Sequence, residues 1–119
     1  MTHYLNLKPQ PFHAIRLGEK TIELRLLDEK RKLIQVGDVL IFKNTEDPDN
    51  TVTVQVIALH FFDSFEELYK ALPLDKCGYT IKELPFASPA DMEAYYSKEK
   101  QSQYGVVGIE IKLLTEGQK

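Results

Sequence analysis

The stretch around residues 18–27 constrains the fold more than any other part of this chain. Gly18 ends a short helical segment, and the residues after it alternate between polar and apolar side chains. Successive side chains of a β-strand point to opposite faces, so Thr21, Glu23 and Arg25 are expected to share one face of a strand. The other face carries the apolar side chains Ile22, Leu24 and Leu26, with Lys20 at its entrance. The pattern therefore predicts a strand that buries one face and gathers a polar site on the other.

Period-two alternation and β-branched residues mark further strands along the chain. The predicted strands cover Tyr4–Leu7, Thr21–Leu27, Val39–Lys43, Thr51–Leu59 and Gly105–Leu114. Residues 28–33 are charged and are predicted to form a turn or an exposed ribbon. Residues 44–50 have strong turn chemistry and are predicted to form a loop. Residues 115–119 are predicted to be a frayed tail.

Capping signals predict three short helices between these strands. They cover residues 12–17, a segment from Ser64 to Ala71, and a segment that starts at Ser88 and includes Met92, Tyr95 and Tyr96. Pro11 and Pro89 suit the first turns of their helices. Ser64 and Glu67 have the spacing of a capping box, in which each side chain satisfies a free amide of the first turn. Residues 74–87 are predicted to be irregular or to contain one helical turn.

The order of the elements limits the fold class. One strand, one helix, three strands, helices and a last strand leave too few helices for a wound parallel sheet. Antiparallel strands with inserted helices favour a small curved α+β sheet, and the pattern alone does not decide whether that sheet closes. The length of 119 residues predicts a single domain over 1–119.

Composition narrows the classes of function. The formal net charge of −3 and the pI of about 5.6 count against tight, non-specific binding of a long nucleic acid. Seven basic residues nevertheless lie within the first 32 positions, while residues 63–93 are richer in acid. This uneven distribution of charge along the chain permits a basic patch on an acidic molecule, although a solvated surface of mixed charge is an equal alternative.

No long apolar run or signal peptide is visible, which predicts a cytoplasmic protein with no membrane partner. The single cysteine, Cys77, excludes an internal disulfide and is predicted to be an inert thiol in a reducing compartment. The three histidines, His3, His13 and His60, are not spaced as metal ligands, so neither a metal nor a cofactor is expected.

The polar face of residues 20–25 is the first candidate for a functional site. Lys20 and Arg25 together suit an anion, such as a phosphate or a developing oxyanion. Glu23 beside them could orient the cations, act as a general base, or accept a hydrogen bond from an exocyclic amine. An exposed set of salt bridges that contributes little energy is the structural alternative.

Two residues outside this strand are added to the candidate site. His60 ends a predicted strand beside two phenylalanines and could reach the mouth of the sheet, or pack half-buried. Tyr95 and Tyr96 are adjacent on the predicted helix, so both cannot face inward. Either one of them packs and the other covers the edge, or one is exposed near the cleft, where aromatic side chains can stack on bases; Tyr96 is the candidate for ligand binding.

Four segments of the chain together resemble one known family. Residues 18–25 fit the pattern Gly-x-Lys-x-x-Glu-x-Arg, which is similar to the signature of the ASCH domains, relatives of the PUA-like RNA-binding barrels. The Gly37-Asp38 turn, the Ala94–Ser97 segment and the Tyr104–Ile111 strand match as well. The resemblance implies a small PUA-like β-barrel with inserted short helices. It also implies RNA binding, ribonuclease-like cleavage or deacylation of N4-acylated cytidine.

The deacylating branch of that family resembles Lys-Thr-Ile-Thr-Ile-Arg at residues 20–25, and its catalysis is implied for the lysine, the second threonine and a downstream acid. Lys20 matches, whereas Glu23 stands at the position of the threonine nucleophile. The candidates for the downstream acid are Asp63, Glu66, Glu67 and Asp75.

Three functions follow as hypotheses. The first is binding of RNA or of a nucleoside- or nucleotide-like small molecule by Lys20, Thr21, Glu23, Arg25, His60 and Tyr96. The second is hydrolysis of a modified nucleoside or of RNA, with Lys20 polarising the developing charge and Glu23 handling protons. The third is a protein-interaction module. The sequence does not define the ligand or the oligomeric state.

Overall fold

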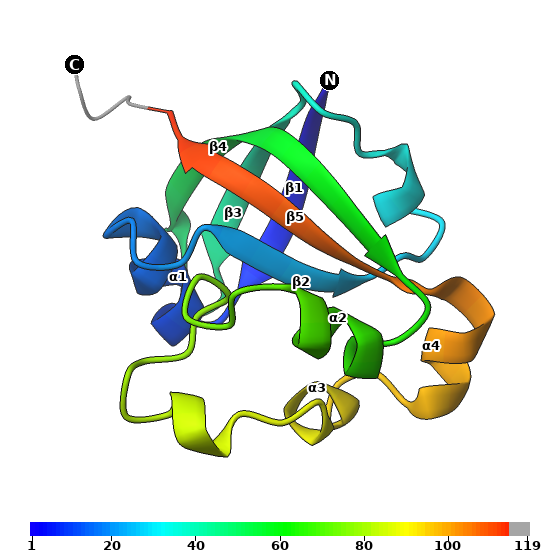
Figure 1. The fold of residues 1–119 in the computed structure, drawn as a ribbon. Coiled ribbons are helices and arrows are strands. Elements are labelled where there is room, and N and C mark those ends of the chain that lie inside the picture. Colours follow the sequence, from blue (N-terminus) through cyan, green and yellow to red (C-terminus); the bar gives the residue numbers. More distant parts are fainter. Residues whose placement is uncertain (115–119) are drawn as a thin grey trace.

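A five-stranded sheet curls into a half-barrel, and short helices lie around it (Figure 1). The structure is a computed structural model that describes residues 1–114. The strands are β1 (Thr2–Leu7), β2 (Ile22–Leu26), β3 (Val39–Asn44), β4 (Asp47–Phe62) and β5 (Val106–Leu113). The α-helices are α1 (Pro9–Arg16), α2 (Phe65–Ala71), α3 (Ala90–Glu93) and α4 (Lys98–Tyr104). Single turns of 3₁₀ helix occur at Arg31–Leu33 and Leu84–Phe86.

The strand order in the sheet is β1-β3-β4-β5-β2, so β1 and β2 form its two edges. The α+β class predicted from the order of elements is confirmed. One pairing differs from the prediction, because β1 runs parallel to β3 while the other pairs are antiparallel. A parallel pair needs a long crossover, and here α1 and β2 lie between the two strands in the chain.

Two apolar clusters lie on opposite faces of the sheet. The interior cluster fills the half-barrel with residues of β1, β3, β4 and β5, and the fully buried Phe12 of α1 joins it. The outer cluster packs α2 against the other face of β2, with Phe65 and Leu68 against Ile22 and Leu24. As a result, all five residues of β2 are buried, including the two polar ones. The sequence pattern predicted burial of only the apolar face of this strand, so the burial of its polar face differs from the prediction.

Several predicted boundaries are wrong, and each error has a local cause. The loop predicted at residues 44–50 is only a turn at Thr45 and Glu46, because β4 already begins at Asp47. The Asn44 carboxamide accepts a hydrogen bond from the Glu46 amide at 3.0 Å, and a register shift beside it absorbs the turn. At its other end β4 continues through His60 to Phe62.

The helix predicted to start at Ser88 and to include Tyr95 and Tyr96 is shorter than expected, and both tyrosines lie beyond its end. α3 ends at Glu93, and Ser97 caps a separate helix, α4, by accepting a hydrogen bond from the Lys100 amide at 3.1 Å. A serine at an N-cap competes with continuation of the preceding helix, and the sequence analysis did not weigh this signal. The capped start of α2 is confirmed, since Ser64 accepts from the Glu67 amide at 3.3 Å.

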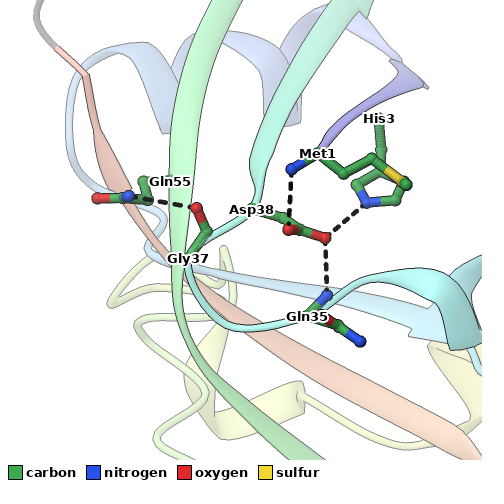
Figure 2. A network of polar contacts seen from close by, with 6 residues as sticks. All are labelled: Met1, His3, Gln35, Gly37, Asp38 and Gln55. Carbon is green, nitrogen blue, oxygen red and sulfur yellow. Dashed lines mark hydrogen bonds and ion pairs between the residues drawn. The ribbon is translucent and has the colours of Figure 1, made fainter.

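Asp38 ties the start of β1 to the turn before β3 (Figure 2). Its carboxylate accepts hydrogen bonds from the Gln35 amide at 2.9 Å and from the Met1 amine at 3.2 Å. His3 Nε2 lies 2.8 Å from the same carboxylate. Gly37, whose φ of 96° favours glycine, makes the turn that presents Asp38 to this network.

The Asp38 network predicts a specific loss of stability in acid. Hydrogen bonds from His3 and Gln35 lower the pKa of Asp38 from 3.8 to about 2. A carboxyl whose pKa is lower in the folded state stabilises the protein above the unfolded value and loses that contribution as the pH falls through the folded value. We therefore expect Asp38→Asn to be less stable than the wild type at neutral pH and to lose less further stability between about pH 4 and pH 2.

Urea unfolding at a series of pH values measures this difference. Asp49→Asn, at an exposed aspartate of β4, is the matched control and should keep the wild-type pH dependence. An Asp38→Asn variant whose stability follows the wild-type curve down to pH 2 would contradict the assignment.

A charged cluster at the seam of the half-barrel

The polar side chains of β2 point into the half-barrel. Glu23 pairs with Ile109 and Arg25 pairs with Val107, and both of these β5 residues belong to the interior cluster. Directly opposed residues of paired strands share a face, so Glu23 and Arg25 share the interior face, as the alternation predicted. Glu23 is only 3% exposed.

Three charged side chains meet at the edge of β2. Lys20 Nζ lies 2.8 Å from Glu23 Oε1, and Arg25 Nε donates to Glu23 Oε2 at 2.5 Å. Arg25 Nη2 also donates to the backbone oxygen of Asn6 at 2.8 Å. Asn6 belongs to β1, so this bond joins the two edges of the sheet, and we call the gap between β1 and β2 the seam.

Lys20 reaches Glu23 although it precedes β2 and was predicted to stand at the entrance of the apolar face. The aliphatic part of its side chain packs against Gly78, where a Cβ would lie 3.2 Å from Lys20 Cδ. Gly78 has a φ of +112°, so the residue at this close approach also adopts a conformation that favours glycine. The loop around Gly78 therefore guides the amine of Lys20 toward the carboxylate.

The electrostatics hold the cluster in its charged form. Burial by itself would raise the pKa of Glu23, but the charges and hydrogen bonds of Lys20 and Arg25 outweigh it and keep the pKa below its ordinary value. Burial likewise works against the charge of Arg25, and Glu23 outweighs it, so the pKa of Arg25 is raised. Two cations thus share one carboxylate, which leaves the cluster with one net positive charge.

Tyr96 lies beside this cluster, whereas its neighbour Tyr95 faces outward. Burial raises the pKa of Tyr96, and the nearby charges of Arg25 and Glu23 act on it in opposite directions. The ring of Tyr96 stacks on Phe65 with centroids 5.8 Å apart. Tyr95 is 62% exposed, and Lys8 Nζ lies 5.2 Å from the centre of its ring.

The other two predicted site residues are not part of the cluster. His60 pairs with Gly108, which pairs with Leu24, so His60 lies on the face opposite to Glu23. Its Nε2 is 2.9 Å from Glu110 Oε1. Thr21 is half-buried and lines a hollow of about 230 Å³ between the end of α1, the segment before β2, and strands β4 and β5; Lys20 lines this hollow too, but Glu23 and Arg25 do not.

The downstream acids predicted as partners of Lys20 are spread over the molecule. Asp63 and Glu66 line a hollow between α2 and α4, and Glu67 pairs with Lys70 at 3.7 Å. Asp75 lies close enough to Cys77 to act on its pKa. The acid that contacts Lys20 is Glu23 itself.

Cys77 is buried against the outer cluster. Burial raises its pKa to about 12, which disfavours the thiolate that a nucleophilic cysteine needs. Among residues 1–114 no three His, Cys, Asp or Glu side chains gather so as to hold a metal ion. None of the helices in this range is both long and apolar enough to cross a membrane.

Sequence reasoning missed four residues around the seam: Asn6, Lys8, Arg31 and Gly78. Asn6 contributes only its backbone oxygen, which no side-chain pattern can reveal. Arg31 follows β2 in a segment that was predicted to be exposed, yet its side chain is 18% exposed and is bonded to Asp28. The positive φ of Gly78 is the kind of feature that an isolated glycine in a loop can signal.

Comparison with models of known protein families identifies the family of this chain. The model of the ASCH domain matches residues 5–115. The chain belongs to the ASCH domain family. The Gly-x-Lys-x-x-Glu-x-Arg resemblance is therefore confirmed at the level of the family, and the cluster at the seam is built from that motif of this ASCH domain.

Solved structures support the fold. Hypothetical protein PH0355 superposes with a TM-score of 0.79 at 29% identity, over 96% of this chain and 100% of that one. Protein PF0455 from Pyrococcus furiosus has a TM-score of 0.70 at 32% identity, over 97% and 99% of the two chains. An ASCH protein from Zymomonas mobilis shares the fold with a TM-score of 0.64 at 14% identity, over 92% of this chain and 65% of that chain. No curated protein sequence matches this ASCH domain.

Proposed function

We propose that this ASCH domain binds RNA or a nucleotide-like ligand at the seam, beside Lys20, Glu23 and Arg25. The observation that carries the proposal is the charge of the cluster. Two cations share one buried carboxylate, so an anionic group beside them would offset the remaining positive charge. Arginine and lysine are the side chains that most often bind phosphate oxygens.

The surroundings of the cluster suit the rest of such a ligand. Tyr95 is exposed and Tyr96 is rigidly stacked, and aromatic rings beside a basic groove accept bases without strong sequence preference. Lys8 adds a further positive charge at Tyr95. The net charge of −3 counts against many simultaneous phosphate contacts, which favours a short segment or a small ligand over a long duplex.

A binding experiment tests the proposal. Thermal shift with nucleosides, nucleotides and short single-stranded RNAs identifies a ligand, and titrations at several salt concentrations follow. We expect affinity to fall with salt, because phosphate contacts release counterions. Lys20→Ala and Arg25→Ala should each weaken binding by roughly 1–3 kcal/mol, the range for charged hydrogen bonds in a desolvated site.

Lys43→Ala is the matched control for Lys20→Ala. Lys43 is exposed on β3, where it lies over the Tyr4 ring on the outer face of the sheet, opposite to the face that carries the cluster. Affinity that does not depend on salt, or that responds equally to Lys20→Ala and Lys43→Ala, would remove the proposal. If no nucleotide or RNA binds, the protein-interaction hypothesis takes its place.

Hydrolysis of N4-acetylcytidine is expected to be absent or weak. Glu23 stands where the deacylating branch has a threonine, and its carboxylate is held ionised between two cations, so it offers neither a hydroxyl nucleophile nor a strong base. Incubating the purified protein with N4-acetylcytidine and separating the products by chromatography measures this. Rapid turnover that Lys20→Ala abolishes would overturn the expectation.

Glu23→Thr extends this experiment. It installs a hydroxyl beside Lys20, and a gain of activity would identify the site as a hydrolase scaffold that lacks its nucleophile. A variant that gains no activity and loses ligand affinity would identify Glu23 as a recognition residue.

A further inference from the structure

The segment that follows α2 holds the start of β2 in place. Residues 73–79, which we call the clasp, fold back from α2 against the residues that precede β2 (Figure 1). The backbone oxygen of Lys76 accepts hydrogen bonds from the amides of Thr21 and Ile22, at 2.9 and 3.0 Å. The clasp therefore fixes the backbone directly after Lys20.

The clasp also holds the side chain of Lys20. A Cβ at Gly78 would lie 3.2 Å from Lys20 Cδ and 3.8 Å from Cε, so the backbone of the clasp packs against the aliphatic chain. At the end of that chain, Nζ lies 2.8 Å from Glu23 Oε1. A lysine side chain is long and flexible, so ordering it costs conformational entropy. The packing on Gly78 stabilises the arrangement in which the amine contacts the carboxylate.

A chain of hydroxyl hydrogen bonds fixes the clasp in turn. The hydroxyl of Tyr79 donates to Asp91 Oδ2 in α3 at 2.6 Å, and it lies 2.7 Å from the hydroxyl of Tyr69 in α2. Because the single proton of Tyr79 goes to Asp91, the Tyr69 hydroxyl is the donor in the second bond. The rings of the two tyrosines also pack edge to face, with centroids 6.0 Å apart. Tyr79 thus joins the clasp to two helices.

Both hydroxyls keep the protons that this chain of bonds requires. Burial raises the pKa of Tyr69. Burial also raises the pKa of Tyr79, and its hydrogen bonds to Asp91 and Tyr69 raise it further. The chain of bonds is therefore intact at neutral pH.

We propose that Tyr79 is a positioning residue of the seam, which holds the clasp on α2 and α3 so that Gly78 keeps the Lys20 amine on Glu23. Tyr79 acts through the clasp, with Gly78 between it and Lys20. The position of Lys20 follows from these contacts alone, whereas the consequence for a ligand rests on the proposed function. A cation that is already in place loses less entropy when it binds an anion, so the clasp preorganises the site.

Side-chain NMR of the ligand-free protein tests the inference directly. Relaxation of the Lys20 Cε methylene, in protein with isotope-labelled lysine, reports the order of this side chain. We expect Lys20 to be well ordered in the wild type and, in Tyr79→Phe, to lose order toward that of the exposed Lys100. Tyr4→Phe, at an exposed tyrosine of β1, is the matched control and should leave the order of Lys20 unchanged.

Global destabilisation does not produce this signal, because the relaxation is measured in the folded state. Unfolding curves show that each variant is folded at the temperature of the measurement. Phenylalanine keeps the ring of Tyr79 and removes only the hydroxyl, with both of its bonds.

Asp91 offers a second pair of variants, because it is exposed and lies at the far end of the chain of bonds. Asp91→Ala removes the acceptor for the Tyr79 hydroxyl, whereas Asp91→Asn keeps an oxygen that can accept this bond. We expect Asp91→Ala to loosen Lys20 and Asp91→Asn to retain the order of the wild type.

Binding extends the test to the proposed site. Titrations with the four ribonucleoside 5′-monophosphates compare Tyr79→Phe, Lys20→Ala and the double variant. We expect Tyr79→Phe to weaken binding by about fivefold, and by no more than Lys20→Ala does. In the Lys20→Ala background it should add nothing, because residues that act through one contact are not additive.

The outcomes separate the inference from the proposed function. Lys20 that stays ordered in Tyr79→Phe, or in Asp91→Ala if Tyr79→Phe does not fold, overturns the inference whether or not a nucleotide binds. Additive losses of affinity in the double variant also overturn it, because Tyr79 would then act independently of Lys20. If no nucleotide binds the wild type, the proposed function fails, and loosening of Lys20 in Tyr79→Phe still supports the positioning role.

Discussion

Glu23→Gln is expected to destabilise this ASCH domain by about 3–5 kcal/mol, the range measured when one partner of a buried ion pair is removed. Glutamine preserves the size of the side chain but not its charge. Lys20 and Arg25 would then remain enclosed at the seam with no carboxylate beside them. Urea unfolding at neutral pH measures the change in the free energy of unfolding.

Glu19→Gln is the matched control, because Glu19 is exposed and the substitution is chemically the same. It should change stability by no more than about 0.5 kcal/mol. The stabilisation from Glu23 should also weaken in the wild type as the pH falls below the ordinary value of 4.5, since its folded pKa is lower. A loss of under about 1 kcal/mol in Glu23→Gln would mean that solvent screens the cluster, and the charge argument for a ligand would fail.

Phe65→Ala is expected to cost about 3–5 kcal/mol, as large-to-small substitutions of buried aromatic residues do. Phe65 is completely buried in the outer cluster, and its removal leaves a cavity between α2 and β2. Phe86→Ala offers a matched control, because Phe86 is 81% exposed and its loss should be nearly neutral. Thermal and urea unfolding of the two variants measure the difference.

The same variant connects stability to binding. Phe65 is the stacking partner of Tyr96, so its loss should loosen that ring and weaken nucleotide binding even below the melting temperature of the variant. Phe86→Ala should leave affinity unchanged. If Phe65→Ala binds as tightly as the wild type, Tyr96 does not depend on the stack for its position, and the prediction that Phe65 preorganises the site is wrong.

The relation between sequence and site is clearest on β2. Its alternation predicted that Glu23 and Arg25 share a face, and the register with β5 bears this out. The same alternation put Lys20 on the opposite side, whereas its amine contacts Glu23. Lys20 precedes the strand, so its direction is set by its packing against Gly78 rather than by strand geometry. Period-two reasoning holds only within the hydrogen-bonded strand.

His60 shows a second limit of predicting the site from the sequence. Its position at the end of a strand predicted a place at the mouth of the sheet, but the pairing with Gly108 puts its side chain on the face opposite to Glu23. Register across three strands decides this, and a change of one residue in register would have reversed it. A single sequence contains no direct record of that register.

The sequence by itself determined the α+β class, the strands of the sheet, the capped start of α2 and the family to which the chain belongs. These features could be predicted because alternation, capping and motif spacing depend on residues that are close together in the chain. Only the tertiary structure decided that β1 runs parallel to β3 and that the polar face of β2 turns inward. It also decided that Arg25 reaches across the seam to the backbone of Asn6. These features depend on contacts between residues far apart in the chain, whose direction and burial are set by the curl of the whole sheet.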